Sequence, residues 1–312
     1  MVEEKTPVSL VLGSGGARGI THVGVIKCLV DRGFDIRYIS GSSMGALIGG
    51  IYAAGKLDVY EQWLCNLQRR DVLGLLDFSF STRSLFKGER IIKVLKELIG
   101  DCNIEDLPIG FTAVATDVNE QREVWLNHGP LFDAVRASMA VPMVFAPVVR
   151  GDQLLVDGGL INPVPIAPTL HNHTALTIAV DLNAPQERHA NLDAAENDEN
   201  ASYVNEGIKA TSSSGYREVI GNYIGNLRRR TKFSDEGELS TFELVYKSMA
   251  TVQTVMTHFK LAAYRPDLLV EIPRNLCTFF EFHRASELID YGYRRTEETL
   301  ERYERHSHIK DT

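Results

Sequence analysis

The sequence of 312 residues has little cysteine, no excess of positive charge and no long uninterrupted apolar run. Its four cysteines are Cys28, Cys65, Cys102 and Cys277, and no two of them have the short spacing of a zinc or redox motif. This scatter predicts reduced thiols and no metal site, as in a protein of the cytoplasm.

No segment has the length and hydrophobicity of a membrane-spanning helix, and residues 1–7 do not resemble a signal peptide. We therefore expect a cytoplasmic location, although export by a dedicated secretion system would leave no mark in the sequence. The formal net charge of −8 argues against nucleic acid as the main partner. Transient contact with a membrane surface stays open, because a local basic patch can act against the overall charge.

What the sequence does contain is an order of elements typical of an α/β fold. An apolar strand at 8–12 runs into the glycine-rich loop 13–19, and a helix at 20–30 precedes a second strand at 36–40. This βαβ unit predicts a parallel sheet. Further strands are expected at 111–118, 123–127, 153–156, 174–180 and 268–272, and further helices at 44–55, 59–76, 88–99, 131–139, 242–261 (facing the core) and 283–305.

A Gly-x-Ser-x-Gly motif centred on Ser43 stands between the strand at 36–40 and a helix of small residues. A strand, a serine in a tight turn and a helix form the nucleophile elbow of serine hydrolases. Gly41 and Gly45 lack Cβ atoms, so strand and helix can approach closely while the Ser43 side chain stands clear. The N-terminal end of the helix suits a developing oxyanion. The alternative is a glycine-rich turn with an unreactive serine.

The glycine-rich loop 13–19 has three interpretations. A dinucleotide fingerprint needs G-x-G-x-x-G, but Arg18 stands in the last position and Gly19 comes one residue late. A phosphate loop needs a Lys-Ser/Thr pair, which the sequence lacks here. We prefer the third interpretation, an anion cradle of backbone N–H groups with the Arg18 side chain beside it. One βα unit before the elbow serine, such a cradle would be an oxyanion hole.

An Asp-Gly-Gly sequence at 157–159 follows the predicted strand at 153–156. It places a carboxylate at a tight turn where functional sites collect, although a plain hairpin turn is the alternative. Asp117 ends another strand, and we expect it to cap a turn. No histidine lies at the strand-end loop that a catalytic triad would use, and His22 is expected to pack beside the glycine loop.

Four motifs in this order resemble one known family. They are 15–19 with His22 and Gly24, 41–45, 136–142, and 157–159 with Asn162 and Pro163. Together they resemble the patatin-like phospholipases, in the form of the short bacterial members, and they are similar to the catalytic domain of neuropathy target esterase. The resemblance is strong over residues 7–182 and loose in the C-terminal part.

The resemblance implies a three-layer α/β/α sandwich with a mainly parallel central sheet, and a Ser-Asp dyad that works without histidine, metal or cofactor. It implies Ser43 as nucleophile and Asp157 as base. The remaining implied site residues are the oxyanion-hole residues Gly15, Gly16, Ala17 and Arg18 and the motif-supporting glycines Gly41, Gly45, Gly158 and Gly159. The loop departs from the commoner D-G-G-G-x-R-G form in its first two places, which we expect to leave the cradle intact.

The implied activity is the hydrolysis of phospholipid or lysophospholipid esters. Two other classes stay open, namely a regulatory binding protein that keeps a vestigial site and a general carboxylesterase for small soluble esters.

The composition changes at about 183–238, which is polar and acidic in its first part. We expect a single domain over 1–312 with this stretch as a mobile insert. Within it, apolar residues at helical spacing over 216–227 precede a basic run at 228–232. This pattern predicts a lid or a membrane-docking helix beside Ser43, or alternatively a cover for the core.

Overall fold

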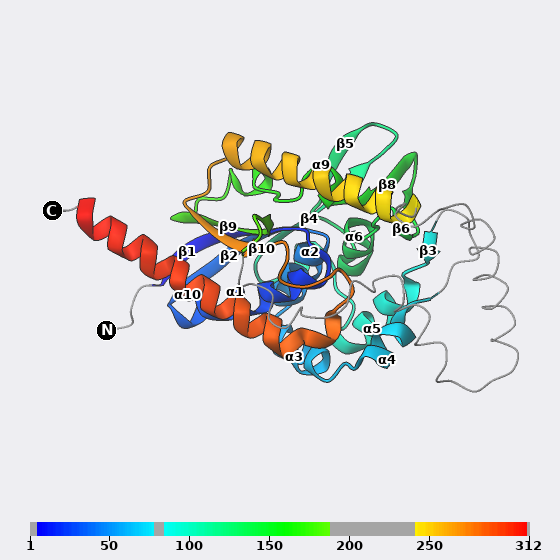
Figure 1. Cartoon of the computed structure of the whole chain (residues 1–312), viewed down its shortest axis with the longest axis horizontal. Helices are drawn as coiled ribbons and strands as arrows, with labels where there is room; N and C mark the ends of the chain where they lie inside the picture. The colour runs from blue at the N-terminus through cyan, green and yellow to red at the C-terminus, as the bar shows by residue number, and fades with distance from the viewer. Residues whose placement is uncertain (1–4, 78–83, 188–240, 311–312) are drawn as a thin grey trace, which may run out of the picture. The chain divides into compact units, whose positions relative to one another are not determined.

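The computed structural model describes residues 5–77, 84–187 and 241–310 (Figure 1). The predicted insert at about 183–238 lies outside these ranges from residue 188 onwards. Its apolar and basic segment lies there too, so a lid or membrane role for it stays a prediction. None of the helices in the described ranges combines the length and the apolar character needed to cross a membrane.

The chain divides into two compact units. One consists of Met1–Leu192 and Val252–Thr312, and the other of Asp193–Thr251, of which only residues 241–251 are described. The sheet, the core and the candidate site all belong to the first unit. A single domain over the whole chain stays a prediction.

The first unit is built on a mainly parallel sheet. In the described part of the chain its strand order is β10-β9-β1-β2-β4-β8-β7, and β5 pairs with β4 outside this path. The parallel strands are β1 (Thr6–Leu12), β2 (Phe34–Ser42), β4 (Gly110–Asp117), β9 (Leu176–Ala184) and β10 (Leu268–Pro273). The antiparallel strands are β5 (Arg122–Leu126), β7 (Val148–Arg150) and β8 (Gln153–Asp157). A small separate sheet pairs β3 (Ser84–Phe86) with β6 (Met143–Phe145).

Helices cover both faces of the sheet, which confirms the predicted three-layer α/β/α architecture. They are α1 (Thr21–Asp31), α2 (Met44–Ala53), α3 (Leu57–Cys65), α4 (Arg69–Leu75), α5 (Glu89–Ile99), α6 (Leu131–Ser138), α9 (Thr241–Ala263) and α10 (Ala285–Lys310). The connections from β1 to β2 and from β2 to β4 both step toward the same edge of the sheet. Because such connections between parallel strands are right-handed, α1 and α2 lie on the same face. Figure 1 shows α10 beside α1 on that face and α9 on the other.

The alternation of side chains along β1 divides the core between the two faces. Leu10 and Leu12 belong to the large cluster that the α1 and α2 side chains complete. Val11 points the other way, into a smaller cluster with Val164 and Ala179, against which Leu261 of α9 packs. Residues of β1 on both sides of the sheet are therefore buried, which explains why the strand is apolar from Val8 to Leu12 except at Ser9.

One predicted helix is divided in the structure, and another has an apolar side that is exposed. The helix predicted at 59–76 is two helices, because the Asp71 carboxylate accepts a hydrogen bond from Gln68 N–H at 2.9 Å and starts a new helix there. The helix predicted at 242–261 faces the core through Leu261, as predicted, and exposes Val252, Val255 and Phe259 on another side.

Candidate active site

Ser43 occupies the junction between β2 and α2 with φ 57° and ψ −121°, in the left-handed region that side chains seldom adopt. The helix α2 approaches both β2 and the neighbouring strand β1 too closely for side chains at the positions flanking Ser43. A Cβ atom on Gly45 would lie 2.0 Å from the Leu12 carbonyl oxygen, and one on Gly41 would lie 2.4 Å from the Gly45 carbonyl oxygen. The two glycines therefore allow the turn that presents Ser43.

The register of β4 brings Asp157 to Ser43. Strand β2 runs parallel to β4 and ends with Ser42 opposite Val114, while β8 runs antiparallel and ends with Asp157 opposite Ala115. Strand β5 occupies the other edge of β4 at these positions, so β2 and β8 share one edge. Their C-terminal ends therefore meet head-on, at adjacent residues of β4.

Ser43 and Asp157 are in direct contact and both are buried. The Ser43 hydroxyl donates to Asp157 Oδ2 at 2.5 Å, and the Gly159 N–H donates to Asp157 Oδ1 at 2.7 Å. Burial raises the pKa of Asp157 to about 7, and the hydrogen bonds from Ser43 and Gly159 oppose this rise. A carboxylate with a pKa near neutrality is a better proton acceptor for a serine hydroxyl than an ordinary aspartate.

The motif at 136–142 contributes contacts that the sequence did not predict. The Ser138 hydroxyl accepts a hydrogen bond from Ser43 N–H at 2.9 Å and donates to the Val114 carbonyl at 2.6 Å. Two residues further on, the Ala140 carbonyl accepts from Asp157 N–H at 2.9 Å. One short segment thus holds the backbone of both members of the pair. The only signal in the sequence was the motif itself, whose role depends on contacts with distant residues.

Four consecutive residues of the glycine loop were predicted to form the oxyanion hole. The Ala17 N–H already donates to the Phe279 carbonyl at 3.0 Å, so it is not available to a substrate in this arrangement. The N–H groups of Gly15 and Gly16 make no hydrogen bond to another described residue. Of the four predicted donors, Ala17 is therefore excluded in this arrangement, while Gly15 and Gly16 stay candidates for an oxyanion hole.

The Arg18 side chain is anchored within the protein. Its guanidinium donates to the Arg274 carbonyl at 2.7 Å and to Asn183 Oδ1 at 3.4 Å. The Asn183 amide also donates to the Ser14 carbonyl at 3.2 Å. Arg18 and Asn183 thus tie the glycine loop to the ends of β9 and β10. The prediction that the Arg18 side chain stands ready beside the anion cradle is replaced by this structural role.

His22 and Asp117 have the structural contacts expected of them. His22 is buried, and its Nε2 lies 2.8 Å from the Gly13 carbonyl. Burial lowers the pKa of His22 to about 4, so the ring is neutral at physiological pH and donates through Nε2. Asp117 accepts a hydrogen bond from Asn119 N–H at 3.1 Å, which closes a turn after β4.

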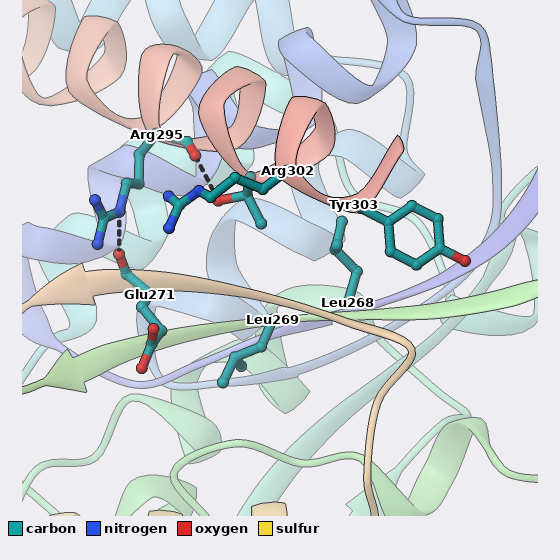
Figure 2. Close-up of a pocket in the computed structure, with 7 residues that line it drawn as sticks. Leu268, Leu269, Glu271, Arg295, Arg302 and Tyr303 are labelled. Carbon is teal, nitrogen blue, oxygen red and sulfur yellow. Dashed lines mark hydrogen bonds between the residues drawn. The ribbon is translucent and has the colours of Figure 1, made fainter. Parts of the chain in front are cut away.

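A hollow of about 280 Å³ lies elsewhere, between β10 and α10 (Figure 2). Leu268, Leu269 and Tyr303 form part of its wall. Arg295 donates to the Glu271 carbonyl at 2.9 Å and also pairs with a neighbouring carboxylate. The hollow thus has no paired nucleophile and acid, so Ser43 and Asp157 remain the candidate site.

The described residues contain no group of three His, Cys, Asp or Glu side chains placed to hold a metal ion.

A buried acid with a raised pKa makes stability depend on pH. Between about pH 4 and pH 7 the folded protein keeps a proton on Asp157 that the unfolded chain has released, so the free energy of unfolding falls as pH rises through this window. The variant Asp157→Asn lacks this titration. We therefore compare the free energies of unfolding of the variant and of wild type. The difference, variant minus wild type, should increase by on the order of 3 kcal/mol between about pH 5 and about pH 8.

Urea unfolding at the two pH values measures this difference. The exposed Asp152→Asn serves as the control and should follow the wild-type pH dependence. Parallel stability curves for wild type and Asp157→Asn would contradict a buried, raised-pKa carboxyl group at this position.

The family model for patatin-like phospholipases matches residues 10–170, which is more than half of the chain. The chain therefore belongs to the patatin-like phospholipase family.

Three sequence relatives agree with this assignment. An uncharacterized NTE family protein of Mycobacterium tuberculosis is 37% identical over 95% of this chain and 92% of its own length. The neuropathy target esterase sws of Drosophila melanogaster is 31% identical over 57% of this chain and 13% of its own length. The lysophospholipase NTE1 of Yarrowia lipolytica is 29% identical over the same shares. The crystal structure of VipD from Legionella pneumophila aligns over 96% of this chain and 67% of its own, at a TM-score of 0.41 and 14% identity.

Proposed function

We propose that this protein is a serine hydrolase that cleaves carboxylic ester bonds of phospholipids or lysophospholipids through a dyad of Ser43 and Asp157. The observation that carries this proposal is the buried 2.5 Å hydrogen bond from the Ser43 hydroxyl to Asp157 Oδ2. Membership in the patatin-like phospholipase family supports a lipid ester as substrate. The relatives named as a lysophospholipase and as neuropathy target esterase support the same substrate class.

In the first half of the reaction, Asp157 accepts the proton of Ser43 while Oγ attacks the ester carbonyl carbon. The carbonyl π electrons move to oxygen, and the N–H groups of Gly15 and Gly16 stabilise the resulting oxyanion. When the tetrahedral intermediate collapses, the bond to the leaving alcohol breaks and the alcohol takes the proton from Asp157. The products are a free alcohol or lysolipid and an acyl ester on Ser43.

In the second half, water replaces the alcohol. Asp157 accepts one proton of the water as its oxygen attacks the acyl carbon, and the same oxyanion site stabilises the second intermediate. Collapse returns the proton to Ser43 and releases a fatty acid. Aspartate has no tautomers, so the pair needs no third residue to orient its base, and the Gly159 N–H keeps the carboxylate in place.

Purified protein incubated with a mixture of phospholipids and lysophospholipids tests the proposal. We expect the protein to release fatty acid, which mass spectrometry detects, and to hydrolyse long-chain esters. Turnover restricted to short-chain soluble esters would make the protein a general carboxylesterase. A folded protein with no turnover of any ester would favour a binding role for the same site.

Gly16 should be the most sensitive glycine of the loop. It adopts φ +57°, and a Cβ atom there would lie 2.4 Å from the Phe279 ring, so Gly16→Ala must displace the ring or rotate the N–H away from the oxyanion. Loss of one oxyanion donor typically lowers turnover about 10²–10³-fold, and we expect a loss in this range. Ester turnover at saturating substrate is the measurement.

Gly33→Ala is the matched control. Gly33 has φ +81°, but no atom lies within 4 Å of an added Cβ, so this variant reports the backbone strain alone. We expect its turnover to equal that of wild type. If a folded Gly16→Ala enzyme also kept wild-type turnover, the glycine loop would not be the oxyanion hole.

A further inference from the structure

Beyond Glu243 in its first turn, α9 has no acidic residue, in a protein with a negative net charge. The chain has 41 acidic residues and a net charge of −8, yet residues 244–266 contain no aspartate or glutamate. The basic residues in this range are Lys247, Lys260 and Arg265. Lys260 pairs with Glu123 on the inner side of the helix, so Lys247 and Arg265 carry the net positive charge of the range. An anionic surface would therefore meet attraction here and repulsion over much of the remaining protein.

The outer side of α9 is apolar. Val252, Val255 and Phe259 recur at positions i, i+3 and i+7, which places them on one face of the helix. Their exposed fractions are 44%, 47% and 65%. The opposite side of the helix packs inward, where Leu261 and Tyr264 contact the smaller core cluster. The three outer side chains, here called the α9 stripe, thus face away from the core.

Contacts in series connect α9 with the turn that carries Asp157. Lys260 Nζ lies 3.3 Å from Glu123 Oε2, and the same carboxylate oxygen accepts a hydrogen bond from the Asn162 side chain. The Asn162 N–H in turn donates to the Gly158 carbonyl at 2.9 Å. The helix is therefore anchored to the candidate site through its inner side, while its stripe remains exposed.

We propose that the α9 stripe docks this protein on anionic lipid surfaces. Exposed aliphatic and aromatic side chains bury themselves at the headgroup boundary, and nearby lysine and arginine add attraction to anionic lipids. The absence of acidic residues between Glu243 and Asp267 lowers the local repulsion that the net charge would otherwise cause. The choice of a lipid partner rests on the proposed function, which needs the enzyme to reach lipid in a bilayer.

Cosedimentation with vesicles tests this docking surface. The protein carries Ser43→Ala, so that the vesicles are not consumed, and the vesicles contain phosphatidylcholine with or without phosphatidylglycerol. We expect the double variant Val255→Ser/Phe259→Ser to bind mixed vesicles about tenfold more weakly, because two apolar contacts with the acyl boundary are lost. Raising the salt concentration should also weaken binding, since it screens the basic residues.

Val149→Ser is the matched control, since Val149 on β7 is 73% exposed and lies outside α9. It should bind vesicles as the parent protein does. Docking by α9 is refuted if the double variant also binds like the parent. A second outcome also refutes it. If neither protein binds vesicles, and the parent is a dimer that the double variant dissociates, then the α9 stripe is a protein interface.

Turnover of a soluble short-chain ester, measured with Ser43 restored, should be unchanged by the double variant. This readout separates the two proposals. Hydrolysis that persists in Ser43→Ala would overturn the proposed function, whereas the vesicle measurement judges the docking surface independently of catalysis.

Discussion

Replacing Ser43 by alanine should lower ester turnover about 10⁴-fold or more and leave the fold intact. The variant removes the Oγ atom that donates to Asp157 and that we propose as the nucleophile. The backbone contact that holds the elbow, from Ser43 N–H to the Ser138 hydroxyl, does not depend on the side chain. A fluorophosphonate probe should label wild type and fail to label Ser43→Ala, while the thermal unfolding of the two proteins stays similar.

Ser42, the neighbour of Ser43 in the Gly-x-Ser-x-Gly motif, provides the control. Ser42 is buried in the elbow, and its hydroxyl has no hydrogen-bond partner among the described residues. Ser42→Ala should therefore keep both labelling and turnover. Equal labelling of Ser43→Ala and wild type would mean that the nucleophile is another residue.

The second large effect is expected for Asp157→Asn. An amide cannot take the proton of Ser43, so we expect turnover to fall about 10³–10⁴-fold, as when the base of a serine hydrolase is lost. The same assignment predicts the pH profile of wild type. Since burial raises the pKa of Asp157 to about 7, kcat/KM should increase as pH rises and level off above that value. Steady-state kinetics across this range measures both effects.

Histidine variants provide the contrast. No histidine hydrogen-bonds to Ser43 or Asp157 in the part of the chain that the structure describes. His258→Gln, an exposed position on α9, should retain the turnover of wild type. A histidine variant that folds normally but is as inactive as Asp157→Asn would indicate a hidden triad and contradict the dyad.

The local part of the candidate site could be predicted from the sequence. The strand before Ser43, the turn and the helix after it are adjacent in the chain, and the glycines that permit the turn are two residues away on each side. The parallel sheet followed from the βαβ order near the N-terminus. These features depend on neighbouring residues and on backbone sterics, which the sequence states directly.

The partner of Ser43 could not be derived in this way. Asp157 lies 114 residues further along the chain, and its sequence context also allowed a plain hairpin turn. The register of two strands on β4 decides that it meets Ser43. The same holds for Ser138, whose hydroxyl supports the elbow from 95 residues away. Burial by the surrounding sheet, rather than any neighbour in the sequence, raises the pKa of Asp157.

By itself, the sequence determined the class of fold, the elbow at Ser43 and the glycine loop, because each depends on short stretches of chain with their own backbone preferences. The tertiary structure alone decided which donors and surfaces remain available. The Ala17 N–H donates to the Phe279 carbonyl, and the Arg18 guanidinium donates to the Arg274 carbonyl after β10, so neither group is left for a substrate oxyanion in this arrangement. Packing also left one apolar side of α9 exposed, since the core beneath accepts only the other side.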